Sequence, residues 1–136
     1  MKNTQFAVSE AASLATKLIA RSEEGKITWD EDPNDFPELS QDAEGFKALL
    51  ENHLEVRVAS DRSAIVFQVL LESPLGPDRT LLSVWLEHDP KFGYDFTGEL
   101  ALHESLVRLH EFARRSALKV DENLAHARDF LERLAG

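Results

Sequence analysis

The segment Ala64–Leu71 is apolar at both its odd and its even positions. Alternate side chains of a β-strand point to opposite faces of a sheet, so a strand apolar at both parities needs cover on both faces. The pattern therefore predicts a central strand with a packed layer on each side. If the helices of the chain leave the second face open, pairing with another copy is the natural way to bury it.

Further strands are predicted on both sides of this one. Residues 54–58 alternate between apolar and charged side chains, as in a half-buried strand, and Thr80–Leu86 repeats the two-sided pattern. The connections are short and rich in Asp, Ser, Gly and Pro, which favours antiparallel hairpins. Residues Phe46–Glu51 fit either a short helix capped by Asp42 or a first strand, and we favour the strand.

Amphipathic helices are predicted at both ends of the chain. Apolar residues recur every three or four positions between about residues 4 and 24, and Gly25 follows where a left-handed C-terminal cap is expected. Two more apolar stripes, Leu102–Ala113 and Leu124–Leu134, are joined by a corner that fits an αα-hairpin. We therefore predict an α+β fold, in which an N-terminal helix, an antiparallel meander of three or four strands and a C-terminal αα-hairpin pack together.

The composition fits a single globular domain spanning residues 1–136. The chain is 43% hydrophobic, and its lack of cysteine excludes disulfides, a thiolate nucleophile and cysteine-ligated zinc. Glu10 and Lys17 interrupt the apolar residues near the N-terminus, so we expect no secretory signal there. No apolar run reaches the roughly 18 residues of a membrane span. We expect a cytoplasmic protein that does not bind membranes.

Negative charge is concentrated in one quarter of the chain. Between Ser22 and Glu55 there are eleven carboxylates and two bases, which gives −9 of a formal net charge of −10. Residues 26–44 also contain two prolines, and like-charge repulsion further disfavours a long helix. We interpret residues 26–44 as an extended, partly ordered segment, named the acidic arm below. Its field repels phosphate, so direct nucleic-acid binding is not expected.

The acidic arm is the predicted partner-binding site. Carboxylates can steer a basic protein surface toward the arm, and the aromatic rings among them can anchor it. The candidate residues are Trp29, Asp30, Glu31, Asp32, Asp35, Phe36 and Glu38. This pattern favours a small non-catalytic binding or regulatory protein of the inhibitor, immunity or anti-defence type. The alternative is a housekeeping homodimer that the arm merely keeps soluble.

The segment from His88 to Phe96 is the alternative site, of a ligand-binding or enzymatic domain. It follows a predicted strand and carries one histidine, two carboxylates and three aromatic rings. Clefts form at such strand ends, and general acid–base chemistry uses such groups. The structural alternative is that the rings tuck beneath the edge of the sheet. The ligand-binding candidates are Trp85, His88, Asp89, Tyr94 and Asp95.

No other motif indicates catalysis, nucleotide binding or a metal site. The sequence from Asp30 to Asn34 begins like a calcium loop, but the glycine and the bidentate glutamate that such a loop requires are missing. His103 and His110 lie about 10.5 Å apart along a helix axis, too far to share one ion. We therefore predict no enzymatic activity, no cofactor and no metal.

Two motifs resemble those of a group of small uncharacterised bacterial proteins. The first is a "GK-aliphatic-x-W" step at Gly25–Trp29, and the second is an "ARR-x-AL-x-VDE-x-L" stretch at Ala113–Leu124. The resemblance implies an N-terminal helix, a short sheet and a C-terminal helical hairpin. It implies no activity, so it adds no site residues to those above.

Overall fold

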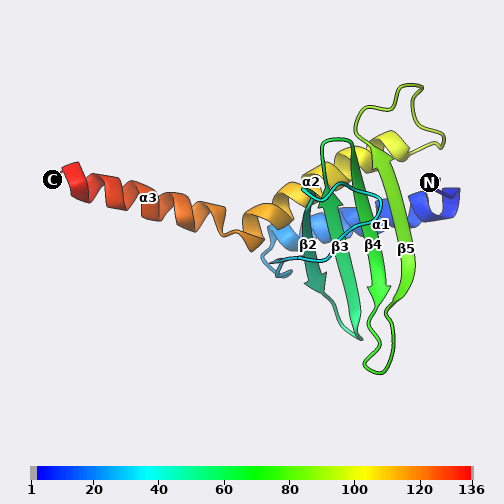
Figure 1. Ribbon diagram of the computed structural model, residues 1–136, viewed down its shortest axis with the longest axis horizontal. Coiled ribbons are helices and arrows are strands. Elements are labelled where there is room, and N and C mark those ends of the chain that lie inside the picture. Colours follow the sequence, from blue (N-terminus) through cyan, green and yellow to red (C-terminus); the bar gives the residue numbers. More distant parts are fainter. Residues whose placement is uncertain (1–2, 136) are drawn as a thin grey trace.

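The chain folds as a five-stranded antiparallel sheet with helices behind it (Figure 1). The computed structural model describes residues 3–135. The elements are α1 (Gln5–Glu23), β1 (Asp30–Glu31), β2 (Glu44–Leu49), β3 (Leu54–Ser60), β4 (Ala64–Leu71), β5 (Arg79–Glu87), α2 (Glu99–Ala117) and α3 (Val120–Ala135). The strands lie side by side in chain order, and each neighbouring pair is antiparallel. The predicted α+β class and meander are confirmed, with five strands rather than three or four.

The first of the long strands settles the ambiguity at residues 46–51. Strand β2 pairs with β3 so that Phe46 lies opposite Val58 and Ala48 opposite Val56. All four side chains are buried in the main core. A helix at this position would have placed the same apolar residues around a cylinder rather than on one face of the sheet. The strand interpretation is therefore confirmed.

Helices α1 and α2 cover one face of the sheet and pack against each other. Helix α1 is capped at its N-terminus by Thr4, whose hydroxyl accepts a hydrogen bond from the Ala7 backbone N–H at 3.1 Å. It ends before Gly25, which has a φ of +72° and reverses the chain as predicted. Between the helices and the sheet, Phe67 and Leu106 are fully buried. None of the helices within residues 3–135 is both long and apolar enough to cross a membrane.

The second face of β4 is covered by the acidic arm of the same chain. Figure 1 shows this segment, in cyan, crossing the front of the sheet while α1 and α2 lie behind it. Phe36 is only 6% exposed and forms a second buried cluster with Ala59 and Val66. Leu39 packs against this cluster as well. The prediction of a central strand covered on both faces is confirmed, and no second copy is needed to cover β4.

Helix α3 projects from the body of the molecule (Figure 1). The corner between α2 and α3 lies between the two predicted stripes, at residues 118–119, and Lys119 adopts a left-handed φ of +50° there. The apolar stripe of α3 was predicted to pack with α2 on the sheet, yet α3 contributes no buried residue to the core. Helices α1 and α2 already occupy the helix-bearing face of the sheet, and the turn at Lys119 directs the chain outward.

Candidate functional site

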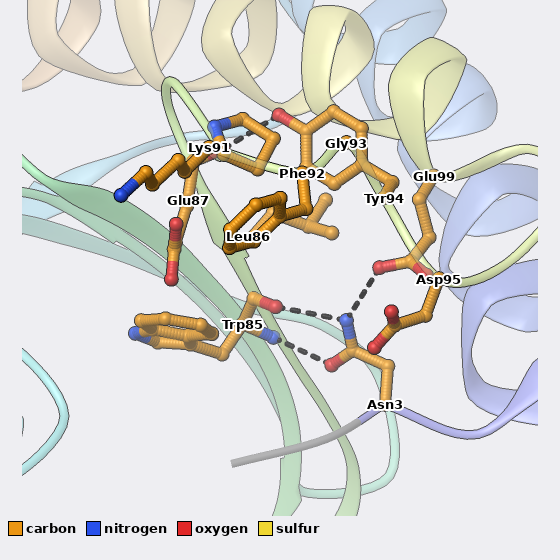
Figure 2. Close-up of a pocket in the computed structure, with 11 residues that line it drawn as sticks. Asn3, Trp85, Leu86, Glu87, Lys91, Phe92, Gly93, Tyr94, Asp95 and Glu99 are labelled. Carbon is orange, nitrogen blue, oxygen red and sulfur yellow. Dashed lines mark hydrogen bonds between the residues drawn. The ribbon is translucent and has the colours of Figure 1, made fainter.

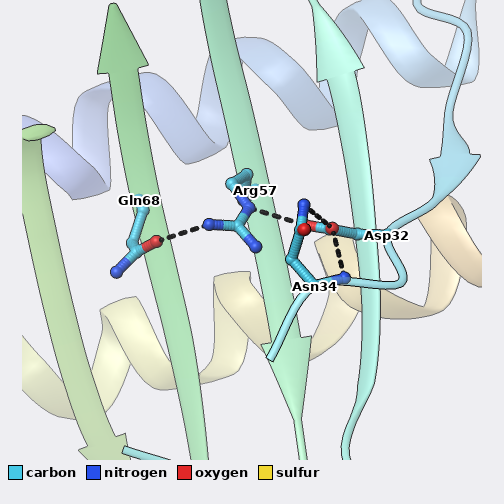
Figure 3. Close-up of polar contacts among 4 residues, drawn as sticks. All are labelled: Asp32, Asn34, Arg57 and Gln68. Carbon is cyan, nitrogen blue, oxygen red and sulfur yellow. Dashed lines mark hydrogen bonds and ion pairs between the residues drawn. The ribbon is translucent and has the colours of Figure 1, made fainter. Parts of the chain in front are cut away.

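A buried ion pair fastens the acidic arm to the sheet (Figure 3). The side chain of Asp32 is fully buried, and its carboxylate accepts a hydrogen bond from Arg57 Nε on β3 at 2.5 Å. The same carboxylate accepts hydrogen bonds from the backbone N–H and the side-chain amide of Asn34, at 3.0 and 2.8 Å. The guanidinium of Arg57 also lies 4.4 Å from the centroid of the Phe36 ring. One arginine thus holds the arm by charge and by a cation–π contact.

The predicted partner-binding residues divide into a buried and an exposed group. Trp29, Asp32 and Phe36 are buried, and Trp29 Nε1 donates a hydrogen bond to Ser22 Oγ at 3.0 Å. The exposed group consists of Asp30, Glu31 and Asp35, while Glu38 is half-buried. Phe36 therefore supports the arm from beneath, Trp29 ties the start of the arm to the main core and to Ser22, and the exposed carboxylates form the outer surface.

A hollow of about 310 Å³ lies within the arm. Phe36, Leu39 and two prolines contribute apolar walls, and Asp35 contributes an exposed carboxylate. Among residues 3–135, Asp30, Glu31 and Asp35 form no ion pair with a basic side chain. The hollow therefore combines apolar contact surface with uncompensated negative charge.

Two buried polar atoms, one within the acidic arm and one on the strand beneath it, have unused hydrogen-bonding capacity. Within the described residues, Arg57 Nη2 and Glu38 Oε2 have no hydrogen-bond partner. Arg57 Nη1 makes only a long hydrogen bond, donated to Gln68 Oε1 of β4 at 3.4 Å (Figure 3). The spacing along the sequence did not indicate that Arg57 would form an ion pair with the acidic arm, because Arg57 lies 25 residues from Asp32.

The alternative site brings His88, just after β5, into contact with His103 of α2. The two rings meet edge to face, with His88 Nδ1 2.8 Å from His103 Nε2. On its other side, His88 Nε2 lies 2.9 Å from Ser60 Oγ and 3.1 Å from the Asp61 carbonyl oxygen. A carbonyl oxygen only accepts hydrogen bonds, so the contact with Asp61 is a hydrogen bond in the tautomer in which His88 Nε2 carries the proton; Nδ1 then accepts from His103 Nε2–H.

Ser60 Oγ and His88 Nε2 lie at the hydrogen-bonding distance of a catalytic serine–histidine pair. The protonation that such a pair needs is a separate requirement. A general base must present an unprotonated nitrogen to the nucleophile, whereas in the tautomer that donates to the Asp61 carbonyl the nitrogen of His88 that faces Ser60 carries the proton. Burial, followed by the proximity of His88, lowers the pKa of His103 below its ordinary value of 6.5. A neutral His103 fits its role as a donor to His88. The arrangement ties the end of β5 to α2.

Two hollows flank the segment from His88 to Phe96. One of about 510 Å³ is lined in part by His88, Tyr94 and His103. The other, of about 410 Å³, lies beside the half-buried Trp85 and includes the 92% exposed Phe92 (Figure 2).

The aromatic rings of this segment do not behave alike. Tyr94 and Phe96 pack partly against the main core, as the structural alternative predicted, but Phe92 does not. Tyr94 donates a hydrogen bond to the Glu87 carbonyl at 2.5 Å, which fixes the segment against the end of β5. The other two predicted residues, Asp89 and Asp95, are exposed.

Asn3 closes part of the free edge of β5 (Figure 2). Its side-chain amide accepts a hydrogen bond from the Trp85 N–H at 2.9 Å and donates one to the Trp85 carbonyl at 2.8 Å. The same amide nitrogen donates to the buried Glu99 at 3.1 Å, and Glu99 accepts a hydrogen bond from the Phe96 N–H at 2.6 Å. These polar groups are satisfied within the fold and are not available to a ligand.

The two histidines of α2 have separate partners. Whereas His103 contacts His88, His110 Nε2–H donates to the Glu44 carbonyl at 3.0 Å. In the part of the chain that the structure describes, no three His, Asp or Glu side chains gather closely enough to hold a metal ion.

No protein-family model, curated protein or solved structure matches the chain. Only the residues of this chain therefore bear on its function, and the resemblance to small bacterial proteins stays a prediction.

Proposed function

We propose that the chain is a non-catalytic binding protein that docks a basic protein partner on its acidic arm. The observation that supports this most is the Asp32–Arg57 ion pair, because it fixes the arm on the sheet. Asp30, Glu31 and Asp35 are exposed around this anchor. Carboxylates held on a rigid surface lose little conformational freedom on binding, and their field accelerates encounter with a basic surface.

The hollow in the arm suits the side chain of a lysine or an arginine. The apolar walls from Phe36 and Leu39 fit the aliphatic stem of such a side chain, and Asp35 is placed to pair with its charged end. A basic residue inserted there would act as the central anchor, with Asp30 and Glu31 as further charges nearby. This makes the chain an inhibitor, immunity or accessory type of protein, which acts by covering a basic surface.

Affinity capture from the native host tests this proposal. Three tagged baits are compared at low and at moderate salt: the wild-type chain, an arm variant and a control. The arm variant carries Asp30→Asn, Glu31→Gln and Asp35→Asn. The control removes the same number of charges from exposed positions elsewhere, through Glu10→Gln, Glu104→Gln and Asp129→Asn. We expect a basic protein on the wild-type and control baits, and its loss from the arm variant.

Association kinetics with the captured protein give the quantitative test. Electrostatic steering raises association rates by about 10- to 1,000-fold at low salt. The arm variant should therefore associate at least about tenfold more slowly than the control, with a weaker dependence on salt. A partner that binds the arm variant and the control at equal rates would remove the arm from the mechanism.

A second candidate function is the binding of a small polar ligand beside His88. The hollow lined by His88, Tyr94 and His103 favours it, because two imidazoles reach one concave surface. Inorganic phosphate and acetate serve as probes, and histidine ring resonances report binding. A saturable shift at His88 and His103 that is lost in His88→Ala would support this function. Resonances that do not move up to millimolar probe would reject it for such anions.

A further inference from the structure

We propose that the apolar stripe of α3 binds the same stripe of a second copy, with the two helices antiparallel. Apolar residues follow one another at steps of four and three along the whole helix, and they are Val120, Leu124, Ala127, Leu131 and Leu134. This is the heptad spacing of a two-stranded coiled coil. The inference does not rest on the function proposed for the acidic arm, since the two surfaces belong to different elements.

Helix α3 has few contacts of its own to stabilise it. It has 16 residues, only slightly more than the roughly 12–15 residues below which an isolated helix is marginal in water. Leu124, Leu131 and Leu134 are 55%, 62% and 68% exposed, and Phe130 beside them is 54% exposed. A projecting helix with a continuous apolar stripe marks an interaction surface rather than a solvated face.

Two copies of this stripe supply enough surface for a weak dimer. Each of the four large side chains offers on the order of 100 Å² of apolar area, so two helices together bring roughly 800–1,000 Å². This area lies below the roughly 1,200–2,000 Å² of stable interfaces and in the range of weak, transient ones. We therefore expect a weak dimer, with a dissociation constant on the order of micromolar to tens of micromolar.

The charges beside the stripe select a second copy in the antiparallel orientation. Asp121 and Arg128 lie seven residues apart on the same flank of the stripe. When Leu124 of one helix lies opposite Ala127 of the other, Asp121 of each helix neighbours Arg128 of the other. Two symmetric ion pairs then flank the apolar contact. In a parallel pair the same two residues would instead lie beside Ser116 and Asn123, which are uncharged.

Two further features fit the antiparallel arrangement. Arg115 of the same chain contacts only Oδ1 of Asp121, at 2.9 Å, which leaves the second carboxylate oxygen for another copy. Each copy also carries a net charge of −10. Antiparallel helices hold the two acidic bodies at opposite ends of a helix roughly 24 Å long, which exceeds the screening length of about 8–10 Å at moderate salt.

Light scattering and sedimentation over a concentration series test the dimer. The mass of the chain should rise from 15.3 kDa toward twice that value as the concentration rises to about 1 mM. Leu131→Asp should keep the chain monomeric, whereas Glu132→Gln on the opposite side of the helix should not. Because Leu131 is exposed, Leu131→Asp leaves the core intact, and the circular dichroism of the sheet checks this. A chain that is monomeric at 1 mM, or a dimer unchanged by Leu131→Asp, would overturn the proposal.

A charge exchange identifies the register. Asp121→Arg and Arg128→Asp should each weaken self-association by about tenfold or more, because like charges then meet at both flanking positions. In an equal mixture, each variant helix offers the charges that the other needs, so a mixed dimer should re-form. If the variants dimerise alone as well as the wild-type chain does, or if their mixture stays monomeric, the antiparallel register is wrong.

Discussion

Replacing Asp32 by alanine should loosen the acidic arm and lower the free energy of unfolding by about 3–5 kcal/mol. The substitution leaves the guanidinium of Arg57, whose side chain is only 13% exposed, without its charge partner. Breaking a buried ion pair from one side costs about this much, because the remaining charge is desolvated and uncompensated. Asn34 also loses the acceptor of its two hydrogen bonds. The loss is a large part of the roughly 5–15 kcal/mol by which a domain of this kind is stable.

Urea unfolding of a double-mutant cycle measures this effect. Arg57→Met removes the second charge while keeping an apolar side chain against Phe36, so the double variant should be more stable than Asp32→Ala alone. Asp35→Ala serves as the matched control, since Asp35 is exposed in the same arm and should change stability by less than about 0.5 kcal/mol. A loss of less than about 1 kcal/mol for Asp32→Ala, or strictly additive effects, would refute the anchoring role of the ion pair.

Three further predictions concern packing, pH and a backbone conformation. Gly45→Ala should destabilise the fold by about 1–3 kcal/mol in urea unfolding, because a Cβ there would lie 2.7 Å from Cε2 of the buried Phe36 ring. Gly76→Ala is the control, because the atom nearest to its added Cβ would lie 3.6 Å away. Burial lowers the pKa of both His103 and His110, so the folded state favours their neutral forms. The stabilisation of the folded state by the two neutral histidines is complete above the ordinary pKa of 6.5 and is lost as the pH falls through the lowered pKa values. A variant with glutamine at both positions should therefore lose less unfolding free energy between pH 7.5 and 5 than the wild type. Lys119→Gly should stabilise the chain by up to about 1 kcal/mol in thermal unfolding, since Lys119 has a φ of +50°; an unchanged or lower melting temperature would argue against strain there.

The elements with strong periodicity could be predicted from the sequence. The apolar pattern of Ala64–Leu71 required cover on both faces of the sheet, and the structure provides it. Which segment of the chain covers the second face could not be predicted in the same way. A segment with seven carboxylates and two prolines gives no periodic signal, and its attachment depends on single contacts such as the one between Asp32 and Arg57. Contacts across 25 residues leave no trace in local spacing.

The candidate sites show the same limit. His88 and His103 were both noted as single residues, but their contact depends on the path of the intervening loop, which the sequence does not define. The stripe on α3 has the spacing of a helix that is buried on one face, yet spacing does not say whether its partner lies in the same chain or in another. The direction of the chain at Lys119 decides that, and a left-handed lysine carries no sequence signal comparable to that of a glycine.

Hydrogen–deuterium exchange of the chain, with and without the basic partner obtained by affinity capture, tests the central claim most directly. Backbone amides of residues 30–43 should exchange more slowly in the complex, because the partner covers the acidic arm. Amides of residues 88–96 should exchange at unchanged rates. Protection confined to residues 88–96, with the arm exchanging as in the free chain, would contradict the account and place the functional surface beside His88.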